Sequence, residues 1–291
     1  MTFADGVWHQ IFSFQDYGEL LALVRNSLVA GAALGLVGGL AGVFVMMRDL
    51  PFAVHGISEL SFAGASAALL LGTDIVAGSI LGSLLAAGTI GILGARARDR
   101  NSVIGIIMPF GLGLGVLFLA LYKGRAANKF GLLTGQIVAV DTPQMAWLLG
   151  TSAVVVSALA VMWRPLSFAS ADPDVAEARG VPVRTLSFAF MLVLGLSVAL
   201  SVQVVGALLV LSLVVTPAAA AARVTASPVL LPALSVLFAV LAIEGGILLA
   251  LGGSIPISPY VTTVSFTIYV VCRLVERQKT KARRKLTPCH S

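Results

Sequence analysis

Long apolar runs, separated by short charged breaks, constrain this chain more than any other feature of its sequence. Each of the nine runs is close to the roughly 20 residues that a helix needs to cross the hydrocarbon core of a bilayer. The runs cover residues 28–47, 52–73, 75–95, 103–122, 146–163, 186–201, 204–222, 229–251 and 260–274. Only 11% of the 291 residues are charged, whereas a soluble domain needs roughly 25% to cover its surface. The pattern predicts an all-α, polytopic transmembrane helical bundle.

The number of spans depends on how the sixth and seventh runs are interpreted. These two runs are nearly contiguous in the sequence, so they could include a broken helix rather than two complete spans. We expect about nine spans, and eight is the alternative count.

Basic residues predict how the bundle is oriented in the membrane. The segment 276–291 is a strongly basic tail, and lysine and arginine near the ends of spans favour the cytoplasmic side. Counting back from a cytoplasmic tail places the loops 96–100 and 164–184 inside as well, and nine spans place the N-terminus outside. We therefore expect a multi-pass protein of the cytoplasmic (plasma) membrane, with an N-terminal interfacial segment, residues 1–27, and a transmembrane domain, residues 28–275, before the tail.

Several function classes lack support in the sequence. The formal net charge of +6 could suggest nucleic-acid binding, but the basic residues lie in short loops and in the tail rather than in a compact basic domain. No G-x-x-x-x-G-K-[ST] motif is present, so the chain has no P-loop to hold the phosphates of ATP. No recognisable nucleophile motif occurs either. We expect no nucleic-acid partner, and we do not expect this chain to be an enzyme.

Two side chains at the start of the second run could hold a metal ion. His55 and Glu59 are four residues apart, which stacks them on one face of a helix, one turn (about 6 Å) from each other. Imidazole and carboxylate together suit zinc or another first-row divalent ion, and ionisable groups in a membrane usually face a cavity or a partner. The alternative is a structural hydrogen-bonded pair near the cytoplasmic interface, because such pairs also occur by chance.

Two further acids could line a route through the bundle. Glu244 is the one acidic residue deep in the eighth run, and Asp141 falls at the predicted outer end of the fifth. We expect a structural or pathway-lining role for Glu244. Solvated acids are normal at the ends of spans, so a role in the route is the less favoured interpretation of Asp141.

The loop 164–184 contains the signals of a short capped helix. In order, it offers an N-cap, a proline for the first helical position, two acids for the positive end of the helix dipole, a base for the last turn and a terminating glycine. These residues are Asp172, Pro173, Asp174, Glu177, Arg179 and Gly180. A helix of about seven residues is not stable alone, so we expect it to dock on a partner or to lie on the membrane surface.

Four stretches, taken together, match the sequence pattern of one known family. Residues 202–221 read VQVVGALLVLSLVVTPAAAA, residues 174–182 read DVAEARGVP, and weaker matches are residues 104–106, IGI, and residues 255–259, IPISP. With these stretches the chain resembles the membrane subunits of zinc, manganese and iron ABC importers, over nearly its whole length. The resemblance implies an ABC importer permease-like fold, and it implies that residues 172–180 dock on an ATPase.

The resemblance also bears on the pair in the second run. In the family this region typically has an aspartate and, four residues later, a histidine, whereas here His55 stands at the first position and Glu59 at the second. The order of residue types is reversed, but a pair one helical turn apart is kept. The resemblance therefore implies that His55 and Glu59 coordinate metal on the permeation route.

Partners and cargo follow from the same resemblance. It implies a second copy of the chain, cytoplasmic ABC ATPase subunits and an extracytoplasmic metal-binding protein, all with membrane lipids around the spans. The transported ion would be zinc first, with manganese or iron as alternatives, and no cofactor would be covalently bound. Two other functions stay open, namely a permease for a metal chelate or vitamin, which would need a wide cavity, and a stand-alone ion-coupled carrier, which would show internal repeats.

Overall fold

The computed structural model describes residues 24–94, 97–124, 131–132, 142–207, 210–251 and 257–286, and within these ranges it contains helices and no strands. Eight of the helices are long and apolar enough to cross a membrane. They are α3 (Arg25–Met47), α4 (Pro51–Leu71), α5 (Ile75–Leu93), α6 (Ala97–Leu121), α8 (Thr142–Ala171), α10 (Val183–Val205), α13 (Leu230–Ala250) and α14 (Ile257–Leu286). The predicted all-α transmembrane bundle is therefore confirmed, and the number of long helices equals the alternative count of eight.

The seventh apolar run is the one that does not form a long helix. It folds as two short helices, α11 (Val210–Val214) and α12 (Thr216–Val224). Pro217 lies in the first turn of α12, where its missing N–H is harmless, whereas within one continuous helix its ring would clash with the preceding turn. Gly206 ends α10 with a φ of 89°, a backbone conformation that side chains with a Cβ disfavour.

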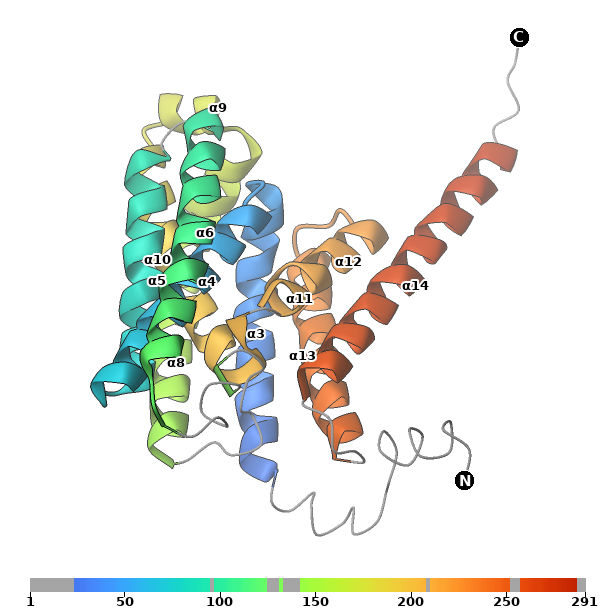
Figure 1. Cartoon of the computed structure of the whole chain (residues 1–291). Helices are drawn as coiled ribbons and strands as arrows, with labels where there is room; N and C mark the ends of the chain where they lie inside the picture. The colour runs from blue at the N-terminus through green and yellow to red at the C-terminus, as the bar shows by residue number, and fades with distance from the viewer. Residues whose placement is uncertain are drawn as a thin grey trace, which may run out of the picture.

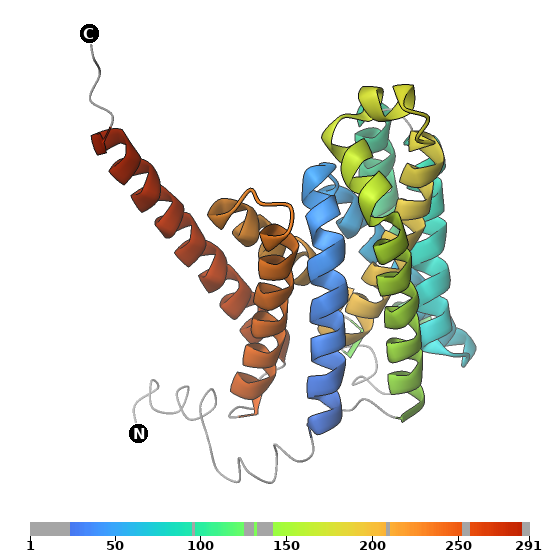
Figure 2. The ribbon, with the colours of Figure 1, turned by 180° about the vertical axis from the view of Figure 1, so that it is seen from behind.

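The short pair α11–α12 reverses the direction of the chain. Figure 1 shows α10 running away from the end of the bundle that carries α9 (Pro173–Ala178), with α13 running the same general way, so α11 and α12 carry the chain part of the way back between them. Helix α3 begins at the end opposite α9. Because α11 and α12 turn the chain back, α14 ends on the side of α9 (Figures 1 and 2). This arrangement suits the predicted orientation, with α9 on the cytoplasmic side.

Two helices, α8 and α14, continue well past the C-terminal ends of the apolar runs that predict them. Helix α8 continues past Trp163 to Ala171, because Leu166 and Ala169 are buried and keep the extra turns packed against the bundle. Helix α14 continues through the basic segment to Leu286. The connection between α8 and α10 is consequently shorter than the polar stretch 164–184.

Small residues allow the central helix α3 to pack closely against α13. A Cβ atom at Gly35 would lie 2.7 Å from Val240 Cγ2, and one at Gly39 would lie 2.5 Å from Val236 Cα. Ser235 donates a hydrogen bond of 2.7 Å to the carbonyl of Gly39 across the same interface. Lipid tails are as apolar as leucine, so close van der Waals contact and such hydrogen bonds hold helices together in a membrane.

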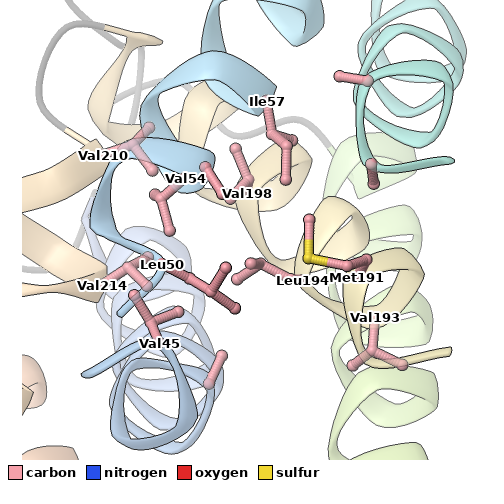
Figure 3. Close-up of a cluster of buried hydrophobic side chains, with 14 of the residues drawn as sticks. Val45, Leu50, Val54, Ile57, Met191, Val193, Leu194, Val198, Val210 and Val214 are labelled. Atoms are coloured by element: carbon pink, nitrogen blue, oxygen red, sulfur yellow. The ribbon is translucent and has the colours of Figure 1, made fainter. Parts of the chain in front are cut away.

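Helix α4 is fixed from several sides. Its Ser61 and Ser79 of α5 share a buried hydrogen bond of 2.7 Å, and Gly64 lets the backbone of α5 approach closely. On another side, a buried apolar cluster joins the α3–α4 corner to α10 and α11 (Figure 3). This cluster includes Val45, Leu50, Val54, Ile57, Met191, Leu194, Val198, Val210 and Val214. The cluster and the α5 contacts give α4 a defined position.

Candidate functional site

The turn between α3 and α4 sets where the predicted metal pair begins. Asp49 adopts a positive φ of 53°, the buried Leu50 follows it, and Pro51 occupies the first turn of α4. Proline suits this position because its φ is already helical and its N–H would have no partner there. The helix that starts here carries His55 and Glu59 on its next two turns.

The two side chains of the pair approach each other as their spacing predicts. His55 Nε2 lies 3.6 Å from Glu59 Oε1. This distance exceeds the 2.7–3.2 Å of a good N–H···O hydrogen bond, so the contact is a loose one. Two ligands on a tetrahedral zinc ion, at bond lengths of about 2.1 Å, stand roughly 3.4 Å apart. The observed separation is therefore close to that of two atoms that share one ion.

Burial makes the pair chemically unusual. The Glu59 side chain is only 3% exposed and that of His55 is 26% exposed. His55 Nδ1 and Glu59 Oε2, the other polar atoms of the two side chains, are buried and have no hydrogen-bond partner among the described residues. Buried polar atoms are nearly always satisfied, so atoms left without a partner mark a place where a ligand or another chain can bind.

A third unpartnered polar atom extends the same face of α4. Ser66 Oγ is buried, and it neither donates nor accepts a hydrogen bond within the described part of the chain. At 100° per residue, His55, Glu59 and Ser66 lie within about 40° of one another around the helix, and they span about 16 Å along its axis. These three polar side chains share one face of α4, on which the buried Phe62 lies between Glu59 and Ser66.

Of the two further acids that could line a route, the described one, Glu244, does not join this pair. Glu244 lies on α13, and its buried, unpartnered Oε1 faces α3 beside Gly31. Asp141 lies outside the described residues. Across the part of the chain that the structure describes, no group of three or more His, Cys, Asp or Glu side chains could hold a metal ion. One chain thus supplies two candidate ligands.

The predicted capped helix of the 164–184 loop is present. Asp172 is the N-cap, and its carboxylate accepts a hydrogen bond of 3.0 Å from the N–H of Val175. Arg179 is the C-cap, and Gly180 follows with a φ of 83°. The helix α9 is anchored through Ala176, which is fully buried, while Asp174 and Glu177 are exposed. The helix lies at one end of the bundle (Figure 1), where Asp174 and Glu177 are exposed.

One residue that the sequence did not single out organises this end of the bundle. Arg48, at the α3–α4 corner, donates hydrogen bonds to Ser170 Oγ (2.9 Å) and Ser187 Oγ (3.0 Å), and its guanidinium lies 5.7 Å from the ring centre of Phe190. Arg48 therefore links the start of α4 to α8 and α10. In the sequence Arg48 resembles any arginine that ends a span, and its charge indicates only that this end is cytoplasmic.

Comparison with known proteins places the chain among transporters. Over 249 residues it is 25% identical to the manganese transport system membrane protein MntC of Halalkalibacterium halodurans, with 85% of each chain covered. Over 253 residues it is 25% identical to the high-affinity zinc uptake system membrane protein ZnuB of Haemophilus influenzae, covering 87% of this chain and 97% of that protein.

The fold of the chain is also similar to that of a solved structure. PsaBC from Streptococcus pneumoniae, determined in complex with Fab, aligns with a TM-score of 0.78 at 25% sequence identity and covers 88% of this chain and 94% of that one. The model of the ABC 3 transport family matches residues 21–276. This match covers most of the sequence and all eight long helices up to the basic end of α14, and the chain therefore belongs to the ABC 3 transport family.

Proposed function

We propose that this chain is the membrane-spanning permease subunit of an ABC importer that moves a divalent transition-metal ion into the cytoplasm. The observation that carries the proposal is the pair of the partly exposed His55 and the buried Glu59, 3.6 Å apart, each with a buried polar atom that has no partner among the described residues. The donor set of one imidazole and one carboxylate suits zinc, and manganese is the second candidate. Relatives named for manganese and for zinc transport support the same class of cargo.

A site with two ligands per chain suits transport. A transported ion must be released, so its site has to be weak or incomplete at some stage of the cycle, as in ion channels. In a symmetric dimer the pair would be duplicated, and if the two faces met, His55 and Glu59 of both copies would form a shell of four ligands. The partial exposure of His55 leaves room for that approach.

The ATPase that this chain lacks would act through α9. The exposed Asp174 and Glu177 offer charged contacts to a cytoplasmic subunit, and the buried Ala176 anchors the helix to the bundle. ATP-driven closure of two ATPase subunits would then push on α9 and shift the spans beside it. An extracytoplasmic metal-binding protein would deliver the ion to the opposite end.

The direct test is metal uptake into liposomes that contain the transporter with its ATPase and binding protein. His55→Ala and Glu59→Ala should each abolish most zinc or manganese uptake per assembled molecule, while Phe52→Ala, one turn earlier on α4 and 71% exposed, should leave uptake near normal. Normal uptake per molecule in both alanine variants would refute the metal site. Uptake of a chelate or vitamin by those variants would instead assign the chain to the larger-ligand class.

A further inference from the structure

A second candidate binding site lies at the end of the bundle that carries α9. A cavity of about 780 Å³ opens there between the α3–α4 corner, the end of α5, the start of α6 and the helices α8 and α10. Pockets for small molecules usually have about 300–1,000 Å³, so this cavity is large enough for a ligand. Three arginines line it, namely Arg48, Arg100 and Arg184.

The described hydrogen-bond partners of Arg48 are uncharged hydroxyl groups. Arg48 donates to the hydroxyls of Ser170 and Ser187, and those hydroxyls in turn donate to backbone carbonyls of their own helices. A guanidinium has five N–H donors, and only two of those of Arg48 find an acceptor in the described part of the chain. The remaining donors leave capacity to bind an anion.

Positive side chains outnumber negative ones among the residues that line the cavity. Asp49 is the one carboxylate among the lining residues, and within the described ranges no ion pair joins it to an arginine. Arg100 Nε is buried and has no hydrogen-bond partner in the part of the chain that the structure describes. Burial lowers the pKa of Arg48, and the nearby positive charge of Arg100 lowers it further, yet an arginine remains charged in proteins. An anion between the two would relieve their repulsion.

The position of the cavity points to the membrane as a source of that anion. Gly91 and Gly94 of α5 line it, and between them Ile92 and Leu93 are 67% and 58% exposed on the outside of the bundle, where acyl chains would contact them. The basic loops at this end place it on the cytoplasmic side. Basic pockets between spans on this side are typical sites for anionic lipid head groups.

We propose that the cavity lined by Arg48, Arg100 and Arg184 binds a phosphate group, supplied by the head group of an anionic phospholipid or by a free phosphate compound. The planar guanidinium matches phosphate oxygens with paired hydrogen bonds. Pro173, the first residue of α9, also lines the cavity, so the bound group would lie against the base of this helix. The site is separate from the His55–Glu59 pair and does not depend on metal transport.

The test measures phosphate-dependent binding by the full chain in neutral detergent. Fluorescent phosphatidylglycerol is titrated into the wild type and into the double variant Arg100→Gln/Arg184→Gln, which leaves Arg48 and its serine contacts in place. Each arginine near an anionic head group contributes about a fivefold factor in affinity, so the double variant should bind about 30-fold more weakly. The control Arg273→Gln/Arg277→Gln removes the same charge from exposed positions on α14 and should bind as the wild type does.

Competition distinguishes the two sources of phosphate. Displacement by unlabelled phosphatidylglycerol but not by inorganic phosphate at millimolar concentration identifies a lipid site, and displacement by inorganic phosphate identifies a site for soluble phosphate compounds. Phosphatidylcholine should displace the probe poorly. Equal affinity in the wild type and in the Arg100→Gln/Arg184→Gln variant would overturn the proposal, as would an equal loss in the α14 control. Loss of co-purifying ATPase with unchanged lipid affinity would also overturn it and assign the arginines to subunit docking.

Discussion

Shortening Glu59 by one methylene tests whether it shares an ion with His55. Two atoms bound to one zinc ion can be at most about 4.2 Å apart, because each bond is about 2.1 Å long. The pair now stands at 3.6 Å, within that limit. Glu59→Asp withdraws the carboxylate by about one C–C bond, 1.5 Å, so the separation would grow to roughly 5 Å. The charge is kept, but no ion could bridge the pair unless α4 rearranged internally, because both residues lie on that one helix.

The expected loss of metal affinity is large because each chain supplies only two ligands to the proposed site. Even groups that only support metal ligands are worth about 10–100-fold in affinity, so losing Glu59 as a ligand should weaken metal binding by at least about 100-fold. Adding His55→Ala to Glu59→Asp should cause little further loss, because residues that act as a unit are not additive. The assay is zinc and manganese uptake per assembled transporter in liposomes, with protein abundance measured in parallel.

The competing interpretation makes the opposite prediction. If His55 and Glu59 were only a structural pair, Glu59→Asp would keep the negative charge and lower the amount of assembled protein, and the surviving molecules would transport normally. Uptake of Glu59→Asp within a factor of two or so of the wild type, at equal abundance, would refute the shared-ion geometry. Independent losses from the two substitutions would refute it as well.

Three further predictions concern topology, coupling and packing. In a cysteine-free background, a probe that cannot cross the membrane should label Thr73→Cys from outside and Glu177→Cys only from inside; labelling of both from one side would contradict the orientation. Glu177→Arg with Gly180→Val should uncouple ATP hydrolysis from transport without loss of membrane insertion, because valine resists the φ of 83° at that position. Metal-stimulated hydrolysis at the normal rate would exclude docking there. Gly35→Val should destabilise the protein by about 1–3 kcal/mol through overpacking against α13, measured as a lower thermal midpoint, whereas Gly113→Ala, with open space around it, should change it little.

The sequence could predict features that depend on local spacing. The long helices follow from the lengths of the apolar runs, and the caps of α9 follow from side chains within one or two turns. The contact between His55 and Glu59 follows from a separation of four residues on one helix. Each of these features needs only helix geometry, which is the same in every protein.

Features that depend on distant segments could not be predicted. Arg48 meets Ser170 and Ser187, which are 122 and 139 residues away in the sequence, and nothing in the sequence distinguishes these serines from others. Glu244 is an isolated acid in both sequence and structure, but only the fold shows that it faces α3 at Gly31. The sequence allows a broken helix in the sixth and seventh runs, but it does not show that the break falls at Val215, between α12 and an α11 that packs against α3 and α4.

Arg48 also connects the two candidate functional regions, which are α9 and the His55–Glu59 pair. Its serine partners lie near the ends of α8 and α10 that flank α9, and its own place in the chain is three residues before α4 begins. His55 lies just over one turn into α4, so few residues separate the corner from the candidate site. Packed helices shift as rigid elements between discrete arrangements. If an ATPase docks on α9, a movement of α8 and α10 would therefore reach the start of α4 through Arg48 and the buried Leu50, and it would move His55 and Glu59 together rather than pull them apart.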